Sequence, residues 1–260
     1  MTVIPRQIAA LSLAGIGLAA LAACSTSSNS SPAAAAGTAS GSASPTTAPS
    51  TAAAASNVGL TDSALRAAFV AAANGATAMH MKGTVTDNGQ TVSMDVQLNK
   101  DDSSAGTLTL GTAQLPVKAV GGVYYLEFTP SFIQYMAKQQ GSNPAAFAAL
   151  SNKWVSSNTT LGKNLATSFS QFMSYSAVVK QVSDNSDGDK VTAAGTGTLN
   201  GQSVAVYNST KGSKLYFAVS GPAYMLEQAV GGSDGTGTID YTWNQPTTVT
   251  PPPASQIYNG

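Results

Sequence analysis

The dipeptide Asn88-Gly89 constrains the fold of this chain more than any other feature of its sequence. Asn-Gly is a strong signal for a two-residue hairpin turn, and apolar and polar residues alternate on both sides of it. Such a turn pairs Asp87 with Gln90 and places Lys82 opposite Asp95, a favourable cross-strand pair. Because a slip by one residue would mix the two faces, the register is well specified. We predict one polar face and one apolar face, the latter formed by Met79, Met81, Gly83, Val85, Val92, Met94, Val96 and Leu98.

Turn dipeptides and alternating residues predict several more strands. They fall at 106–110, 115–120, 123–128, 191–199, 202–207, 215–219 and 237–244. In the hairpin around Asn200-Gly201, Gly195 and Gly197 are expected opposite Val206 and Val204. A long run of antiparallel hairpins forms a sheet that curls unless it closes.

Helices are predicted from apolar spacing and capping residues. They fall at 61–74, 130–138, 144–152, 161–175 and 222–230. The most regular apolar stripe is that of Leu161, Leu165, Phe169, Phe172 and Met173. Because strands and helices occur in runs and do not alternate one by one, the fold class is predicted to be α+β with an antiparallel sheet.

Residues 1–23 have the properties of a secretory signal peptide. Arg6 supplies a positive charge, and the apolar stretch 8–23 is shorter than the roughly 20 residues that span a bilayer. Leu21-Ala22-Ala23-Cys24 resembles the bacterial lipobox, in which the cysteine becomes the lipidated first residue. The two chains of a diacylglyceryl group hold a protein stably on a membrane, whereas one chain is marginal. We therefore expect residues 1–23 to be removed and Cys24 to be acylated.

The following segment has the composition of a flexible tether. Residues 25–56 are Ser, Thr, Ala, Pro and Gly, with Asn29 as the exception, so nothing offsets the entropy of ordering them. Such a tether has a root-mean-square span on the order of 30 Å. We predict a lipidated cysteine and disordered tether over residues 24–57, and a single domain over residues 58–260.

Composition argues against several classes of function. The chain has no net charge and only 9% charged residues, so it lacks the basic excess of a nucleic-acid-binding protein. Its single cysteine excludes an internal disulfide and a multi-cysteine metal site. The single histidine, His80, falls on the polar face beside Lys82 and Gln97, and we interpret it as a solvated strand residue. Because no catalytic carboxylate pair, phosphate-binding glycine loop or nucleophile elbow is present, we expect no enzyme activity, no metal and no cofactor.

Residues 184–189, with the sequence DNSDGD, superficially resemble a calcium-binding loop. Aligning Gly188 with the invariant glycine of such a loop puts Ala194 where the bidentate glutamate belongs. We therefore interpret the segment as a hairpin turn.

The apolar faces are the remaining candidates for a binding site. Methionine is flexible and polarizable, and it is favoured where a surface must fit varied apolar partners. Two interpretations stay open: the apolar side chains line a ligand cavity, or they form a close-packed core under the helices. The candidates are Met79, Met81, Val92, Met94, Val96, Leu108, Leu110, Tyr124, Leu126, Phe128, Phe169, Phe172, Leu215 and Phe217.

The order of several weak features, taken together, resembles a known family. A lipobox, a tether and an opening helix are followed by the hairpin after Met79-His80-Met81-Lys82-Gly83. Then come Gly121-Gly122-Val123-Tyr124-Tyr125, the turn Leu199-Asn200-Gly201-Gln202, and Tyr241-Thr242-Trp243-Asn244-Gln245-Pro246 near the end. Over residues 58–255 the chain resembles the LppX/LprG-type lipoproteins of actinobacteria and, more distantly, the LolA/LolB-like lipid carriers. The segment 137–157, rich in Ala, Gln, Ser and Asn, departs from the family.

The resemblance implies a strongly curved antiparallel sheet, or half-open barrel, with helices packed across its concave face. It also implies an apolar cavity that takes acyl chains, and a role in binding or carrying a lipid or lipoglycan. The implied location is the outer face of the cytoplasmic membrane, where the protein is anchored through Cys24, extends into the cell wall and meets an envelope transport protein. The alternative is a non-enzymatic surface module that binds a protein or cell-wall partner and has no ligand cavity.

The lipobox interpretation is tested at Cys24. Replacing Cys24 with Ala removes the thiol that is alkylated, so we expect a protein that is either uncleaved or shed into the medium. Detergent partitioning and gel mobility measure this. A mature-sized variant that still partitions into detergent would contradict the interpretation.

Overall fold

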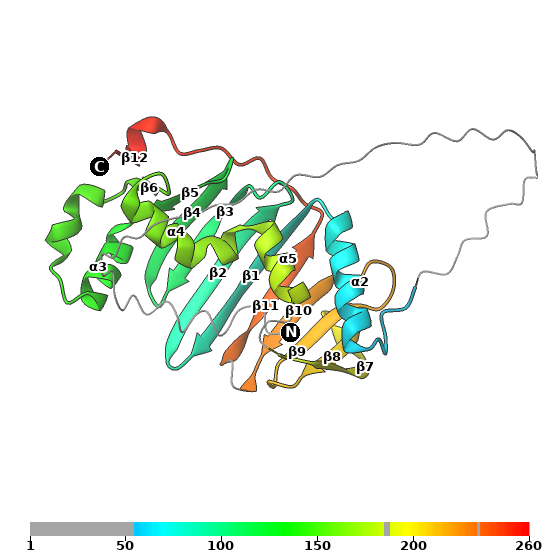
Figure 1. Ribbon diagram of the computed structural model, residues 1–260. Coiled ribbons are helices and arrows are strands. Elements are labelled where there is room, and N and C mark those ends of the chain that lie inside the picture. Colours follow the sequence, from blue (N-terminus) through cyan, green and yellow to red (C-terminus); the bar gives the residue numbers. More distant parts are fainter. Residues whose placement is uncertain (1–54, 185–187, 233–234, 260) are drawn as a thin grey trace, which may run out of the picture.

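The strands of the described part of the chain form one open sheet (Figure 1). The computed structural model describes residues 55–184, 188–232 and 235–259, so the predicted signal peptide, Cys24 and nearly all of the predicted tether lie outside the described residues. The strand order is β12-β6-β5-β4-β3-β2-β1-β11-β10-β9-β8-β7. Neighbouring strands are antiparallel except for β12 and β6. The strands are β1 (Ala78–Asp87), β2 (Gln90–Asn99), β3 (Ser104–Leu110), β4 (Ala113–Val120), β5 (Val123–Glu127), β6 (Trp154–Ser156), β7 (Val191–Leu199), β8 (Gln202–Ser209), β9 (Lys214–Ala218), β10 (Met225–Val230), β11 (Thr236–Trp243) and β12 (Ile257–Tyr258).

The hairpin predicted around Asn88-Gly89 lies near the centre of the sheet. β1 and β2 pair with Asp87 opposite Gln90 and with Lys82 opposite Asp95. The two turn residues have φ values of 49° and 75°, as a tight hairpin turn of mirror-image type requires. All apolar side chains of the predicted inner face are buried. The predicted register and the division into two faces are therefore confirmed.

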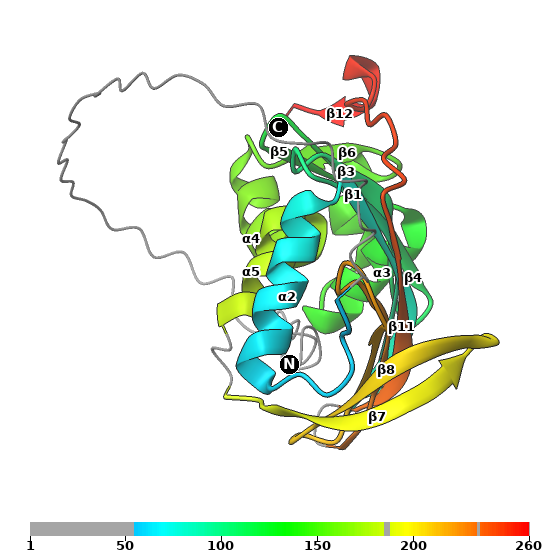
Figure 2. The ribbon, with the colours of Figure 1, turned by 90° about the vertical axis from the view of Figure 1, so that its right-hand side faces the viewer.

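Helices cover this apolar face. Figure 2 shows α2 (Asp62–Gly75), α4 (Thr160–Met173) and α5 (Tyr175–Asp184) in a layer on one side of the sheet. α3 (Pro130–Gln139) follows β5, and two short 3-10 helices are η2 (Pro144–Leu150) and η4 (Ala254–Gln256). Threonine hydroxyls cap the first turns of α2, α3 and α4 by accepting backbone N–H groups. The core lies between the helices and the sheet, and the predicted α+β class is confirmed.

Glycines let adjacent strands of the sheet approach closely. A Cβ atom on Gly106 of β3 would lie 2.6 Å from the Cα of Val96 on β2, and closer still to the carbonyl oxygen of Asp95. A Cβ atom on Gly83 would likewise lie 2.6 Å from the Cα of Ile239 on β11. Because side chains cannot fit there, these positions allow the sheet to bend and twist. Figure 2 shows that the sheet is strongly twisted overall, since β7 and β8 run across the direction of β4 and β11.

The structure differs from the prediction in the second half of the chain. The helix predicted at 222–230 is wrong, because β10 fills the place between β9 and β11 and pairs with both. Hydrogen bonds to two neighbouring strands override the local helical pattern. The pairing of Gly195 with Val206 is also wrong: Gly195 lies in a bulge between Ala193 and Thr196, with φ of 88°.

Two further predicted helices are altered. The helix predicted at 161–175 ends at Met173, and α5 begins two residues later as a separate helix. The helix predicted at 144–152 is the 3-10 helix η2. The strands β6 and β12 are too short for their alternation to be recognised in the sequence.

Both ends of the described chain are bonded to the sheet. Asn57, placed by the prediction in the tether, is buried, and its backbone N–H donates to the carbonyl oxygen of Val219 at 2.8 Å. At the other end, β12 covers the free edge of β6. Among the described helices, none combines the length and the apolar character needed to cross a membrane.

The close approach of β2 and β3 can be tested at Gly106. Gly106→Ala places a methyl group against the backbone of β2, so we expect a loss of at least about 1–3 kcal/mol in the free energy of unfolding. Gly75→Ala is the control, because a Cβ there meets no atom within 4 Å, and its effect should stay within about 0.5 kcal/mol. Urea unfolding measures both. Equal stability of the two variants would contradict a rigid close approach.

Candidate functional site

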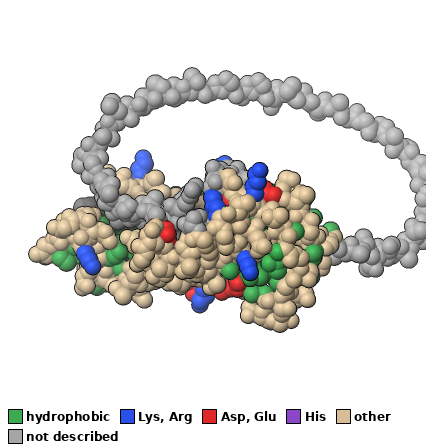
Figure 3. Space-filling view, turned by 90° about the horizontal axis from the view of Figure 1, so that it is seen from below, with side chains coloured by type: hydrophobic (Ala, Val, Ile, Leu, Met, Phe, Trp, Pro, Cys, Tyr) green, Lys and Arg blue, Asp and Glu red, His purple; other side chains and the backbone are tan. Residues whose placement is uncertain are grey.

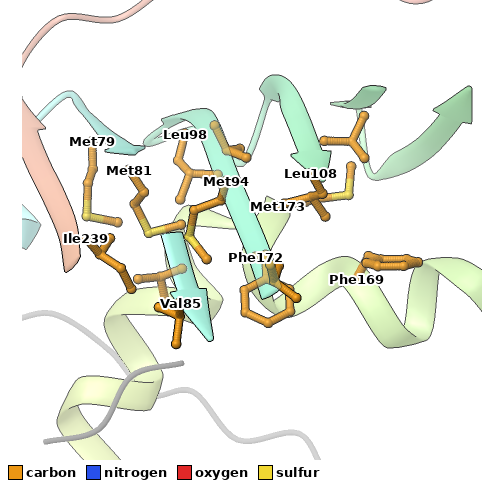
Figure 4. Packing of buried hydrophobic residues seen from close by; sticks show 14 of the residues in the cluster. Met79, Met81, Val85, Met94, Leu98, Leu108, Phe169, Phe172, Met173 and Ile239 are labelled. Atoms are coloured by element: carbon orange, nitrogen blue, oxygen red, sulfur yellow. The ribbon is translucent and has the colours of Figure 1, made fainter. Parts of the chain in front are cut away.

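The candidate site lies between the middle of α4 and the apolar face of β2 and β3. Phe169 and Phe172 project from α4 toward the sheet, and Figure 4 shows Phe172 close to Met94. Because these two phenylalanines are three residues apart on a helix, they share one face. We call this contact zone the α4 seam; its six residues are Val92, Met94, Leu108, Leu110, Phe169 and Phe172.

A small void remains in the α4 seam. Its volume is about 10 Å³, and among the described residues apolar side chains alone line it. This is at the lower limit for holding a single water molecule, and a water also needs polar partners. The void is therefore apolar and no larger than about one water molecule, and an acyl chain needs more space than it offers.

The local sequence explains why these residues meet. Alternation in β2 and β3 turns Val92, Met94, Leu108 and Leu110 to the same face, where Val92 pairs with Leu110 and Met94 with Leu108. The Thr159 hydroxyl caps the first turn of α4 by accepting a backbone N–H at 3.1 Å. The seam is thus the meeting of one strand pair and one helical stripe.

Both ends of α4 are held in place. At its start, Gly162 lies so close to the carbonyl carbon of Ser156 that a Cβ would come within 2.5 Å of it. At its end, Asp102 in the β2–β3 turn accepts the Ser174 hydroxyl at 3.0 Å and the backbone N–H of Ser176 at 2.9 Å. The middle of α4 rests on the sheet through apolar contacts. Expansion of the seam therefore falls on this middle section and on its phenylalanines.

The other predicted site residues lie in the same core but away from the void. Phe217 packs against Phe69 of α2, with ring centroids 6.4 Å apart. Tyr124 is half-buried on β5. The remaining ones are buried, namely Met79, Met81, Val96, Leu126, Phe128 and Leu215. The structure thus gathers six of the fourteen predicted residues around the void and distributes the rest through the core.

A groove that the sequence did not predict adjoins the seam. Its volume is about 190 Å³, and it lies between α3 and the ends of β2 and β3. We call it the α3 groove; its lining residues are Gly89, Gln90, Thr91, Val92, Leu110, Gly111, Tyr135 and Gln139. Alternation in a strand gives no indication that a distant helix meets its end, so the sequence carried no signal for this groove.

The polar face of the sheet carries the single histidine. His80 Nε2 lies 2.7 Å from Asp95 Oδ1, and Lys82 Nζ lies 2.9 Å from Asp95 Oδ2. The hydrogen bond with His80, opposed by partial burial, holds the pKa of Asp95 below its usual value. His80 is thus paired with a carboxylate, where the sequence predicted only a solvated residue. Nearby, a depression of about 430 Å³ is lined mainly by Thr, Ser, Lys and Asp residues.

The segment 184–189 is not a hairpin turn, because it connects helix α5 to strand β7. Residues 185–187 lie outside the described residues. The carboxylate of Asp189 is buried and accepts the hydroxyls of Ser209 and Thr210 at 2.8 Å. Asp189 therefore has a structural role at the start of β7.

Charge does not gather at one place on the described surface that Figure 3 shows. Lys, Arg, Asp and Glu side chains are scattered over the face seen from below. This agrees with the low charged fraction of the chain.

Comparison with known proteins gives similarity of fold alone. No model of a protein family matches the sequence, and no curated protein matches it. The Mycobacterium tuberculosis lipoprotein LppX is similar with a TM-score of 0.43 and 17% identity, covering 73% of this chain and 100% of LppX. An uncharacterized conserved protein from Thermus thermophilus has a TM-score of 0.36 and 8% identity, covering 74% of this chain and 94% of that chain. MucB, solved in complex with MucA(peri), has a TM-score of 0.33 and 13% identity, covering 76% of this chain and 60% of that chain.

The void makes a prediction about two valines on the same strand. Val92→Ile adds one methylene beside the void, so we expect a change between zero and a gain of about 0.8 kcal/mol in the free energy of unfolding. Val96→Ile adds the same group where the core is filled, and we expect a loss of about 1–3 kcal/mol. Chemical unfolding measures both. An equal loss in the two variants would show that the void offers no usable space.

Proposed function

We propose that this chain is a non-enzymatic envelope lipoprotein that binds or carries a lipid or lipoglycan, with an acyl chain held in the α4 seam. The observation that carries the proposal is the void in the seam, whose described lining is entirely apolar. It marks a place where the helical layer does not fill the space above the sheet completely. An acyl chain there would gain about 0.8 kcal/mol for each buried CH₂ group.

Binding requires the seam to widen, since the void of about 10 Å³ is too small for a chain. The ends of α4 are fixed by Gly162 and by the hydrogen bonds to Asp102, so the change falls on the middle of the helix. Met94 on the opposite wall is unbranched and adapts to different shapes. Phe169 and Phe172 would turn aside and then contact the chain along its length.

The anchoring proposal rests on the sequence. Removal of residues 1–23 would leave Cys24 as the first residue, and its acyl chains would hold the protein on the outer face of the cytoplasmic membrane. The segment before Ala55 would then let the domain extend into the cell wall, where an envelope transport protein is a candidate partner.

A second candidate function is a surface module that binds a protein or cell-wall partner. The observation that favours it is the filled core, since most predicted cavity residues are in close contact and the void is small. This candidate requires no opening of the seam. The two proposals therefore differ in whether lipid enters the core.

Lipid binding can be tested with residues 25–260, which contain the whole described domain and lack Cys24. Native mass spectrometry after expression in a bacterial host should show a co-purifying lipid. After delipidation, a brominated fatty acid should quench the fluorescence of a Phe172→Trp variant in which the native Trp154 and Trp243 are replaced by Phe. The reason is that bromine quenches an indole only at short range.

The matched control is Phe217→Trp in the same background, which places the single indole in the same core on β9, four strands away from β2. We expect little quenching there. Absence of both a co-purifying lipid and quenching at position 172 would contradict the lipid proposal and favour the surface module. Equal quenching at both positions would show a cavity that extends from β2 to β9.

A further inference from the structure

We propose that the α3 groove is the mouth of the lipid site and that it receives a neutral, hydrogen-bonding headgroup. The inference rests on the proposed function, because the groove can be the entrance to a lipid site only if the α4 seam binds an acyl chain. It adds the entry point and the chemical class of the headgroup.

The α3 groove and the void share two lining residues. Val92 and Leu110 form part of both walls, and they are a directly paired couple on β2 and β3. The pair therefore lies at the boundary between the void and the groove. A chain that passes over Val92 and Leu110 therefore runs from solvent into the seam without crossing the sheet. The depression on the polar face lies on the other side of the sheet, so a chain entering there would have to cross it.

The rim of the groove is polar but uncharged. Its polar side chains are those of Gln90, Thr91, Tyr135 and Gln139. Partial burial raises the pKa of the Tyr135 hydroxyl, opposed by a hydrogen bond with Gln139, so the hydroxyl stays neutral at physiological pH. The Tyr135 ring stacks on Phe132, with centroids 6.3 Å apart, which fixes its position on α3.

The uncharged, hydrogen-bonding rim of the groove determines which lipid headgroups it can bind. Amide and hydroxyl groups donate to and accept from the hydroxyls of sugars and glycerol, and they donate to ester carbonyls. A phosphate placed there would lose part of its hydration without a positive partner, because no Lys or Arg of the described chain lines the groove. The groove therefore fits a neutral acylglycerol or glycolipid better than an anionic phospholipid.

The entry point is tested by narrowing the groove. In residues 25–260, Gln139→Trp places a large ring at the rim, and we expect uptake of a fluorescent fatty-acyl probe to slow by about tenfold. Gln134→Trp is the matched control, because Gln134 is exposed on the same helix and does not line the groove. Its uptake rate should equal that of the unmodified chain. Equal rates in all three proteins would overturn the α3 groove as the mouth.

The headgroup is tested by competition between lipids with identical acyl chains. Diacylglycerol should displace the probe at least about tenfold more effectively than phosphatidic acid, which differs only by its phosphate. Gln139→Lys should narrow this difference, whereas Gln134→Lys should not. A preference of the unmodified chain for phosphatidic acid would overturn the neutral-headgroup assignment.

The outcomes separate this inference from the proposed function. If the unmodified chain takes up no probe, both fail together. If it takes up probe and Gln139→Trp has no effect, lipid binding stands and the mouth lies elsewhere. If Gln139→Trp slows uptake but the headgroup preference is absent, the entry point stands and the assigned headgroup chemistry is wrong.

Discussion

The strict alternation of β1 and β2 gives the central hairpin one apolar face and one polar face, and the rest of the structure depends on this division. The apolar face must be kept from water, and α2, α4 and α5 do this on one side of the sheet (Figure 2). The polar face carries Thr, Ser and the His80–Asp95–Lys82 group and needs no cover. A molecule built in this way has its large apolar interface between the sheet and the helices, and an apolar ligand is best held there.

Tightness of packing varies along this interface. Where Gly83 and Gly106 let neighbouring strands approach, backbone atoms are in close contact and leave no room for a side chain. Under α2, aromatic rings such as Phe69 and Phe217 meet edge to face in a filled core. Under the middle of α4, flat phenylalanine rings meet methionine and leucine side chains and leave a void. The seam under α4 therefore already offers an apolar space from which a ligand site could widen.

Local sequence signals predicted the first half of the fold well, because the register around Asn88-Gly89 and the position of the first helix depend on neighbouring residues alone. The prediction failed at β10, whose helix-like sequence becomes a strand because two neighbours supply its hydrogen bonds. For the site, alternation identified which side chains face inward. It could not predict where packing would be loose, since this depends on how α4 crosses β2 and β3. The α3 groove forms only where α3 meets the end of a hairpin. The sequence around Tyr135 and Gln139 therefore contains no pattern that identifies these residues as part of the rim of a groove.

The central claim is that the middle of α4 moves away from the sheet to admit an acyl chain. The most direct measurement is the distance between spin labels attached at Ser168, exposed on α4, and Thr109, on the polar face of β3, determined by pulsed electron paramagnetic resonance. The account predicts that a saturating long-chain monoacylglycerol lengthens this distance in delipidated protein. A distance distribution that is unchanged when the lipid is added would contradict the claim.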